Sequence, residues 1–217
     1  MKLIVFGASG MVGMGALREA LADAQVTEVL AVGRRSCGVT HPKLRELRIP
    51  DFFEFAAFEP QLTGYDACLW SVGMTSIGKG EAEYAKLTVE LTLLWARALL
   101  RLNPVFSFCY CSAMGAEGSS MWARVRQRVE NGLRALPFRY SGCVRPGFIR
   151  PGSGIRSATK LYQAAIVVGK PLFPILLKLF PQYATTSERL GRAMVRVVQG
   201  KADVYILESR DINRIGA

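Results

Sequence analysis

The stretch Lys2-Leu3-Ile4-Val5-Phe6-Gly7-Ala8-Ser9-Gly10-Met11-Val12-Gly13 decides the fold. An apolar run typical of a buried strand leads directly into a glycine-rich turn, and a helical pattern of apolar residues follows as far as Leu21. The first glycine allows a sharp turn, the second lets the backbone approach a pyrophosphate, and the third allows close packing of helix on sheet. The start of the helix offers free N–H groups to phosphates. The stretch therefore predicts a dinucleotide site built from Gly7, Ser9, Gly10, Met11, Val12 and Gly13.

The second predicted strand, Glu28 to Val32, is followed by Gly33, Arg34 and Arg35. In dinucleotide-binding folds an acidic residue at this strand end binds the ribose 2′-hydroxyl of NAD, whereas arginine accommodates the 2′-phosphate of NADP. Here no carboxylate is present, and a guanidinium group pairs well with phosphate. The pattern favours NADP(H). The alternative is a solvated basic turn.

Three further strands are predicted, near Leu44 to Ile49, Tyr65 to Gly73 and Val105 to Ser112. After the third strand, Asp51 either accepts a hydrogen bond from the adenine amino group or caps the next helix. Ser71, Val72 and Gly73 end the fourth strand, where small residues would let the backbone lie against a cofactor ribose.

A long helix is predicted from Glu81 to Leu102, and its buried face is predicted to hold Ala82, Ala85, Val89, Leu93 and Ala96. Strands that alternate with helices predict an α/β, Rossmann-type, doubly wound parallel sheet. Such sheets bind ligands at the carboxyl ends of their strands. We expect one NAD(P)-binding domain, with a dinucleotide-binding core at 1–150 and a small C-terminal substrate or lid lobe at 151–217.

Length and composition fit one well-buried domain, because 217 residues with 50% hydrophobic content suffice for a single core. The formal net charge is +11, but Lys and Arg are spread along the chain. Nucleic-acid binding normally has a clustered basic stripe, so we expect no nucleic-acid partner. A small-molecule substrate or a protein partner is expected instead, in a monomer or homodimer.

The five cysteines are odd in number and lack Cys-x-x-Cys spacing, and Cys109 and Cys111 fall in an apolar run, where buried free thiols are expected. With one histidine, a histidine–cysteine zinc site is not expected. The first strand follows Met1 directly, which predicts no signal peptide. Together these features predict a cytoplasmic protein.

The last third of the sequence is predicted to lie on the substrate side. It holds a mixed helix from Ser157 to Val168, with Tyr162, and then an apolar segment from Leu172 to Phe180. Prolines and lysines interrupt the apolar run well before it reaches the length of a membrane span. The segment could then form a lid, a subunit interface or a membrane-surface helix. Thr185 and Glu188 predict a capping box, and Asp203 to Leu207 predict a final strand.

A family resemblance rests on several motifs beside the glycine turn: Gly33-Arg34-Arg35, Met121-Trp122-Ala123-Arg124-Val125, Arg145-Pro146-Gly147-Phe148-Ile149 and Thr185-Thr186-Ser187-Glu188-Arg189-Leu190-Gly191-Arg192-Ala193-Met194. The chain resembles the atypical, extended, epimerase-like short-chain dehydrogenases/reductases over nearly its whole length. It is most similar to the branch with the human Tat-interacting oxidoreductase-like protein and its bacterial relatives. The resemblance implies a Rossmann fold that binds NADP(H), with Arg145, Pro146 and Gly147 at the cofactor.

The chain departs from this family at the catalytic pair. Family chemistry uses Tyr-x-x-x-Lys after the fifth strand, but the matching positions here are Trp122 and Arg126. Trp offers only a weakly acidic N–H donor, and Arg cannot deprotonate. Ser112 matches the companion serine, but Ala113 stands where the family often keeps a second one. Ordinary acid–base catalysis is therefore not expected.

Two functions remain open at this stage. The first is an oxidoreductase or epimerase-like enzyme with a modified mechanism, in which Ser112 or Tyr162 supplies hydrogen bonding and Arg126 supplies charge. The second is a non-catalytic, NADPH-loaded binding or regulatory protein. Fold alone does not separate the two.

Overall fold

A parallel sheet of seven strands forms the centre of the protein, in the order β3-β2-β1-β4-β5-β6-β9. The computed structural model describes residues 1–154, 177 and 179–217. The strands are β1 (Lys2–Phe6), β2 (Glu28–Gly33), β3 (Leu44–Arg48), β4 (Ala67–Trp70), β5 (Ser107–Cys111), β6 (Ser141–Arg145) and β9 (Ile206–Glu208). The strand order reverses between β1 and β4, which confirms the doubly wound Rossmann-type sheet.

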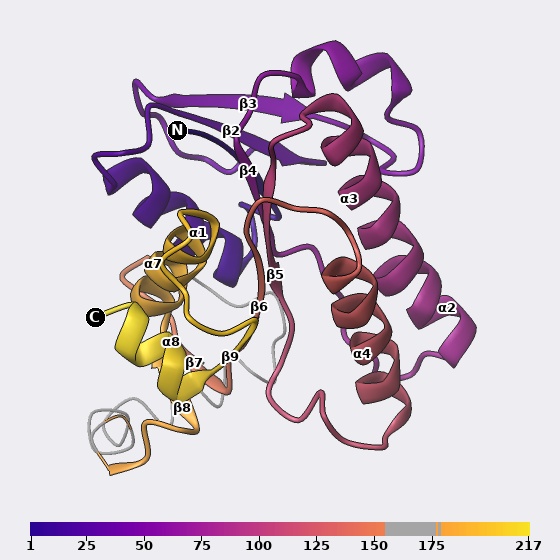
Figure 1. The fold of residues 1–217 in the computed structure, drawn as a ribbon, viewed down its shortest axis with the longest axis vertical. Helices are drawn as coiled ribbons and strands as arrows, with labels where there is room; N and C mark the ends of the chain where they lie inside the picture. Colours follow the sequence, from indigo (N-terminus) through magenta and orange to yellow (C-terminus); the bar gives the residue numbers. More distant parts are fainter. Residues whose placement is uncertain (155–176, 178) are drawn as a thin grey trace.

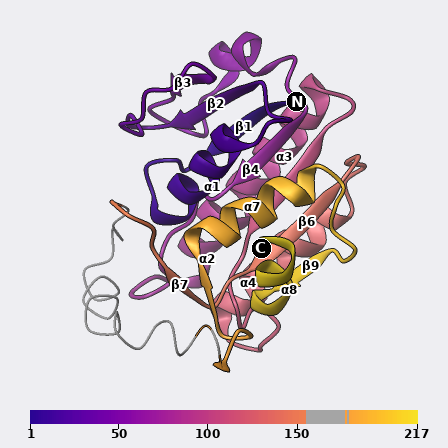
Figure 2. The same cartoon turned by 90° about the vertical axis from the view of Figure 1, so that its left-hand side faces the viewer.

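Helices cover both faces of this sheet (Figure 1). One face carries α1 (Met11–Ala22), α7 (Ser187–Val198) and α8 (Ser209–Ile215), and the other carries α2 (Glu81–Ala85), α3 (Leu91–Leu102) and α4 (Met121–Arg134). Figure 2 shows α1 and α7 side by side on the same face of the sheet. Their close approach requires glycine, because a β-carbon on Gly15 would lie 2.7 Å from the Ser187 carbonyl oxygen.

The core has two parts, one on each side of the sheet, since side chains alternate along every strand. In β1, Ile4 and Phe6 face α3 and α4, whereas Leu3 and Val5 face α1 and α7. The α3 side is rich in aromatic rings. Phe6 contacts Trp70 and Trp95 at ring-centroid distances of 4.6 and 4.7 Å. These contacts fix the end of β1 from which the glycine turn departs.

The long helix predicted from Glu81 to Leu102 is present, but it contains a π turn, η2 (Lys86–Glu90), between α2 and α3. Of the face predicted to be buried, Ala85, Val89 and Ala96 are buried and Leu93 is partly buried. Ala82, in the first turn, is exposed, so its predicted burial is wrong, and Tyr84 is buried there instead.

The C-terminal part of the chain contributes one strand to the main sheet and one strand to a second sheet of two strands. β9 pairs with β6 at the edge of the main sheet, and it begins at Ile206 rather than at the predicted Asp203. β7 (Phe148–Arg150) pairs with β8 (Ala184–Thr186) in a separate parallel ladder. The cap of α7 is Thr186, whose hydroxyl accepts from the Arg189 N–H. The predicted capping box at Thr185 is therefore wrong by one residue, because the Thr185 hydroxyl donates to Asn213.

Two predictions of the last third fall on residues that are not described. The helix from Ser157 to Val168, with Tyr162, lies wholly outside the described residues, and so does most of the apolar segment from Leu172 to Phe180. Within the described residues, no helix has both the length and the apolar character needed to cross a membrane. The division of the chain at residue 150 stays a prediction.

Candidate functional site

The glycine turn between β1 and α1 has the geometry of a phosphate cradle. Gly7 has a φ of +79°, and its carbonyl accepts from the Gly10 N–H at 2.8 Å. A β-carbon on Gly13 would stand 2.1 Å from the Gly7 carbonyl oxygen, so only glycine fits there. Gly10 caps α1 without a side-chain hydrogen bond, which leaves the first-turn N–H groups available to a ligand. These features fit the pyrophosphate of a dinucleotide.

Ser71, at the end of β4, closes the other side of the turn. Its hydroxyl donates to the Phe6 carbonyl oxygen at 2.5 Å, and its oxygen lies 2.6 Å from the position of a β-carbon on Gly13. The structure thus brings the predicted residues of β1 and β4 together at the point where the strand order reverses. Met11 and Val12 are partly buried and pack on the core side of α1, and Ser9 is exposed.

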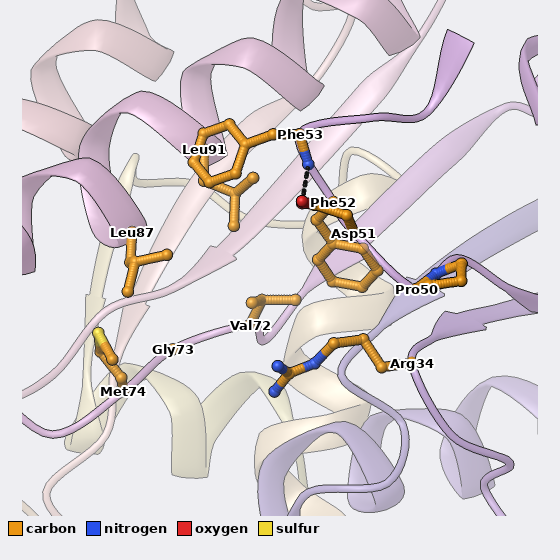
Figure 3. Close-up of a pocket in the computed structure, with 10 residues that line it drawn as sticks. All are labelled: Arg34, Pro50, Asp51, Phe52, Phe53, Val72, Gly73, Met74, Leu87 and Leu91. Carbon is orange, nitrogen blue, oxygen red and sulfur yellow. Dashed lines mark hydrogen bonds between the residues drawn. The ribbon is translucent and has the colours of Figure 1, made fainter. Parts of the chain in front are cut away.

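A cavity of about 360 Å³ lies at the carboxyl ends of β2, β3 and β4 (Figure 3). It brings together four predicted residues that follow β2, β3 and β4: Arg34, Asp51, Val72 and Gly73. Figure 3 shows the Arg34 side chain extending beneath Val72 and Phe52. The other lining residues were not predicted: Pro50, Phe52, Phe53, Met74, Leu87 and Leu91. Their apolar side chains make this a site with the size and lining of a small-molecule pocket.

Asp51 shapes the wall of this cavity. Its carboxylate accepts from the Phe53 N–H at 2.8 Å and closes a tight turn. The next helix, η1 (Ala56–Leu62), is capped by Phe55, so the helix-capping alternative for Asp51 is wrong. The turn is also held from the core, because the Trp95 indole N–H donates to the Phe52 carbonyl at 2.8 Å.

Arg35 borders a second, shallow hollow on the other side of the β2 end. This hollow is also lined by Ser9, Gly33 and Arg48. Arg48 was not predicted, although the parallel register that pairs it with Gly33 puts it at the same sheet edge. Glu46 also borders the hollow, but its carboxylate accepts from the Ser36 hydroxyl at 3.0 Å and the Cys37 N–H at 2.7 Å. Three arginines, Arg34, Arg35 and Arg48, are therefore exposed around the β2 and β3 ends.

The positions that replace the tyrosine–lysine pair lie on the first two turns of α4. Trp122 is partly buried, and its ring tip approaches Gly115. The Arg126 Nε donates to the Tyr84 hydroxyl at 3.2 Å, and its Nη1 donates to the Tyr110 hydroxyl and the Cys111 carbonyl, both at 3.4 Å. Burial raises the pKa of Tyr110 well above its ordinary value, so this phenol stays protonated. Tyr84 and Tyr110 were missed by the sequence predictions.

Ser112 follows β5 directly and is 4% exposed. Its hydroxyl has no hydrogen-bond partner within the described part of the chain. Buried hydroxyl groups are normally paired, so an orphan at a strand end is unusual.

Arg145 is held by carboxylates rather than left free. Its guanidinium donates to Glu130 at 3.0 and 2.6 Å, to Glu208 at 3.0 Å and to Glu117 at 3.3 Å. Pro146 is buried, and the Gly147 N–H donates to the Ser209 hydroxyl at 2.8 Å. These bonds connect β6 to α4 and α8. A cofactor contact by this triplet stays a prediction.

Comparison with known proteins gives low sequence identity and a clear fold. No family model matches the chain. Protein FMP52, mitochondrial, of Chaetomium globosum is 26% identical over 227 residues, which cover 98% of this chain and 96% of that protein. The UDP-N-acetylglucosamine 4-epimerase of Methanobrevibacter ruminantium M1 superposes with a TM-score of 0.70 at 14% identity, over 95% of this chain and 74% of that one.

A further neighbour is a 2-deoxy-D-gluconate 3-dehydrogenase-like structure from Agrobacterium tumefaciens, solved with bound NADP, with a TM-score of 0.65 at 16% identity over 95% of this chain and 93% of that one. The fold is thus the Rossmann-type fold of short-chain dehydrogenases and epimerases. The narrower relation to the Tat-interacting branch stays a prediction.

The predicted cytoplasmic location is contradicted by these comparisons. The matching relatives from Chaetomium globosum, Scheffersomyces stipitis, Emericella nidulans and Aspergillus oryzae are all named as mitochondrial proteins. The prediction rested on the expected lack of a signal peptide and on the cysteines, which are all free. Free thiols report a reducing environment and do not distinguish one reducing compartment from another.

Proposed function

We propose that the chain binds NADP(H) and acts as an oxidoreductase or epimerase-like protein with modified acid–base machinery. The observation that carries this proposal is the glycine turn, in which a β-carbon on Gly13 would meet the Gly7 carbonyl oxygen at 2.1 Å. This close packing holds the helix start in place, and the first-turn N–H groups of α1 stay available to a pyrophosphate, as dinucleotide sites require. The neighbouring cavity of about 360 Å³ is suited to the adenine.

The arginines around the β2 end support NADP(H) over NAD(H). Arg34 lines the cavity, while Arg35 and Arg48 line the hollow next to Ser9. Together they would surround a 2′-phosphate with positive charge, whereas Glu46, the nearest carboxylate in the hollow, is occupied by hydrogen bonds within its own loop.

When bound, the nicotinamide would accept or donate a hydride, and the chain must handle the proton. Trp122 has no group of suitable acidity for that task. The Ser112 hydroxyl has no partner in the described part of the chain and could bind a substrate oxygen. Arg126 would add a fixed positive charge that stabilises negative charge on the substrate without moving a proton.

A second candidate function is a non-catalytic protein that binds NADPH and uses the loaded state to recognise a partner. The Trp122 and Arg126 substitutions favour it, because removal of a positioned acid–base group typically lowers a rate by a factor of about 10² to 10⁴.

NADPH oxidation with aldehydes, ketones and quinones tests both candidates. Neither keeps the ordinary proton donor, so we expect tight NADPH binding and turnover of these generic substrates near background in the unaltered protein. The Trp122→Tyr/Arg126→Lys double variant should gain activity, whereas the matched Trp122→Phe/Arg126→Lys variant, which lacks only the phenol oxygen, should not. Fast turnover by the unaltered protein would exclude the non-catalytic function, and absence of NADPH binding would refute both.

A further inference from the structure

Arg145, which is buried, and Arg126, which is partly buried, differ in how their charge is balanced. Arg145 contacts three carboxylates, those of Glu130, Glu117 and Glu208. Arg126 contacts no carboxylate of the described residues within 4.0 Å, and its printed hydrogen bonds go to two phenols and one carbonyl. Arg126 is therefore a partly buried cation whose hydrogen-bond partners are all neutral groups.

A cation removed from water without a counter-charge is unfavourable, since phenol and carbonyl dipoles replace only part of its hydration. The hydrogen bonds of Arg126 use its Nε and Nη1, while its Nη2 has no bond within the described residues. Residues with unbalanced charge at ligand-binding positions are candidates for function. An anion would balance this one.

Ser112 gives a second, independent indication of a ligand at the same place. It directly follows Cys111, whose carbonyl accepts from Arg126, and its buried hydroxyl has no partner in the described part of the chain. Both groups lie at the carboxyl end of β5, which is the edge where sheets of this kind bind their ligands.

We infer that Arg126 and Ser112 bind a carboxylate group of the substrate, which is therefore an organic acid. The Arg126 Nη2 and the Ser112 hydroxyl would each offer a donor to one oxygen of a planar carboxylate. Trp122 lies one turn before Arg126 on the same helix and supplies an aromatic surface for the apolar part of such an acid. The inference rests on the proposed function, since it names the substrate class of the same site.

Calorimetric titration of the full chain, with and without NADPH, tests this inference. The probes are acetate and benzoate, and acetamide and benzamide are their neutral counterparts. The variants are Arg126→Gln, Ser112→Ala and Arg126→Lys, and Arg128→Gln is the control because Arg128 is exposed on the same helix. Loss of one charge-assisted hydrogen bond should weaken carboxylate binding about tenfold or more.

We expect benzoate to bind the NADPH-loaded protein at least tenfold more tightly than benzamide. Arg126→Gln should remove that preference, Ser112→Ala should reduce it several-fold, and Arg126→Lys and Arg128→Gln should retain most of it. NADPH affinity should stay unchanged in all four variants. Should Arg126→Gln fail to fold, Ser112→Ala and Arg126→Lys still decide the matter.

Equal binding of acid and amide, or failure of both acids to bind, would overturn the inference and leave the proposed function intact. The inference is also overturned if Arg126→Gln weakens NADPH binding as strongly as it weakens benzoate binding, because Arg126 would then bind the cofactor. If NADPH does not bind at all, the proposed function fails, whereas benzoate binding to the free protein that depends on Arg126 would still support the anion site.

Discussion

Gly7 and Gly13 are so close that a β-carbon on Gly13 would lie 2.1 Å from the Gly7 carbonyl oxygen. This contact sets the angle at which α1 leaves β1 and directs the start of the helix toward the cofactor position. One residue pair thus determines both local packing and the proposed phosphate site.

Gly13→Ala should therefore damage stability and binding together. Overpacking of this kind costs about 1–3 kcal/mol of unfolding free energy, and a displaced α1 should weaken NADPH binding at least tenfold. Urea denaturation and calorimetry measure the two effects. Gly73→Ala is the control for stability, because a β-carbon there meets nothing within 4 Å. Wild-type stability and affinity in Gly13→Ala would show that the turn is adaptable.

The Arg145–Glu130 pair should be a major contributor to stability rather than to binding. Both side chains are buried, with 8% and 2% exposure, and Nη2 lies 2.6 Å from Oε2. Removal of one partner of a buried pair costs about 3–5 kcal/mol because the other charge is left unbalanced.

We expect Glu130→Ala to lower the unfolding free energy by that amount. The Glu130→Leu/Arg145→Met double variant should lose less, since no buried charge remains. Glu117→Ala, at the exposed end of the same cluster, should cost under about 1 kcal/mol. A small effect of Glu130→Ala in urea denaturation would contradict this assignment.

Stability should fall in alkaline solution through the buried thiols. Burial raises the pKa of Cys143 from 9.0 to about 12, and the neutral thiol is the form that the fold favours. The unfolded chain loses this proton first, so the contribution is complete below pH 9 and is lost as the pH rises toward 12.

The expected slope is about 1.4 kcal/mol per pH unit for one such thiol. Urea denaturation of wild type and Cys143→Ala between pH 8 and 10.5 isolates it, because other groups contribute to both proteins. Parallel pH profiles for the two proteins would mean that Cys143 ionises normally in the folded state.

The sequence predicted the sheet and the glycine turn because their signals are local. Apolar runs, glycine spacing and Arg34 are read directly from neighbouring positions. The pocket wall was missed because Phe52 and Leu87 meet there only after β3, β4 and the long helix are assembled. The π turn was missed because helical periodicity does not reveal one inserted residue.

Charge balance also depends on distant contacts. Arg145 and Arg126 both occur in motifs that suggested ligand binding, yet the structure surrounds one with carboxylates and the other with phenols. Glu130, Tyr84 and Tyr110 come from three different elements, so no sequence spacing links them to these arginines.

Calorimetric titration with NADPH and NADH is the most direct test of the central claim that this chain binds NADP(H). We predict that NADPH binds at least tenfold more tightly, a difference of about 1.4 kcal/mol or more. Arg34→Ala/Arg35→Ala should abolish most of this preference while NADH binding changes little, and Arg48→Ala should reduce it further. Equal affinities of the unaltered protein for NADPH and NADH, or no binding of either, would contradict the account.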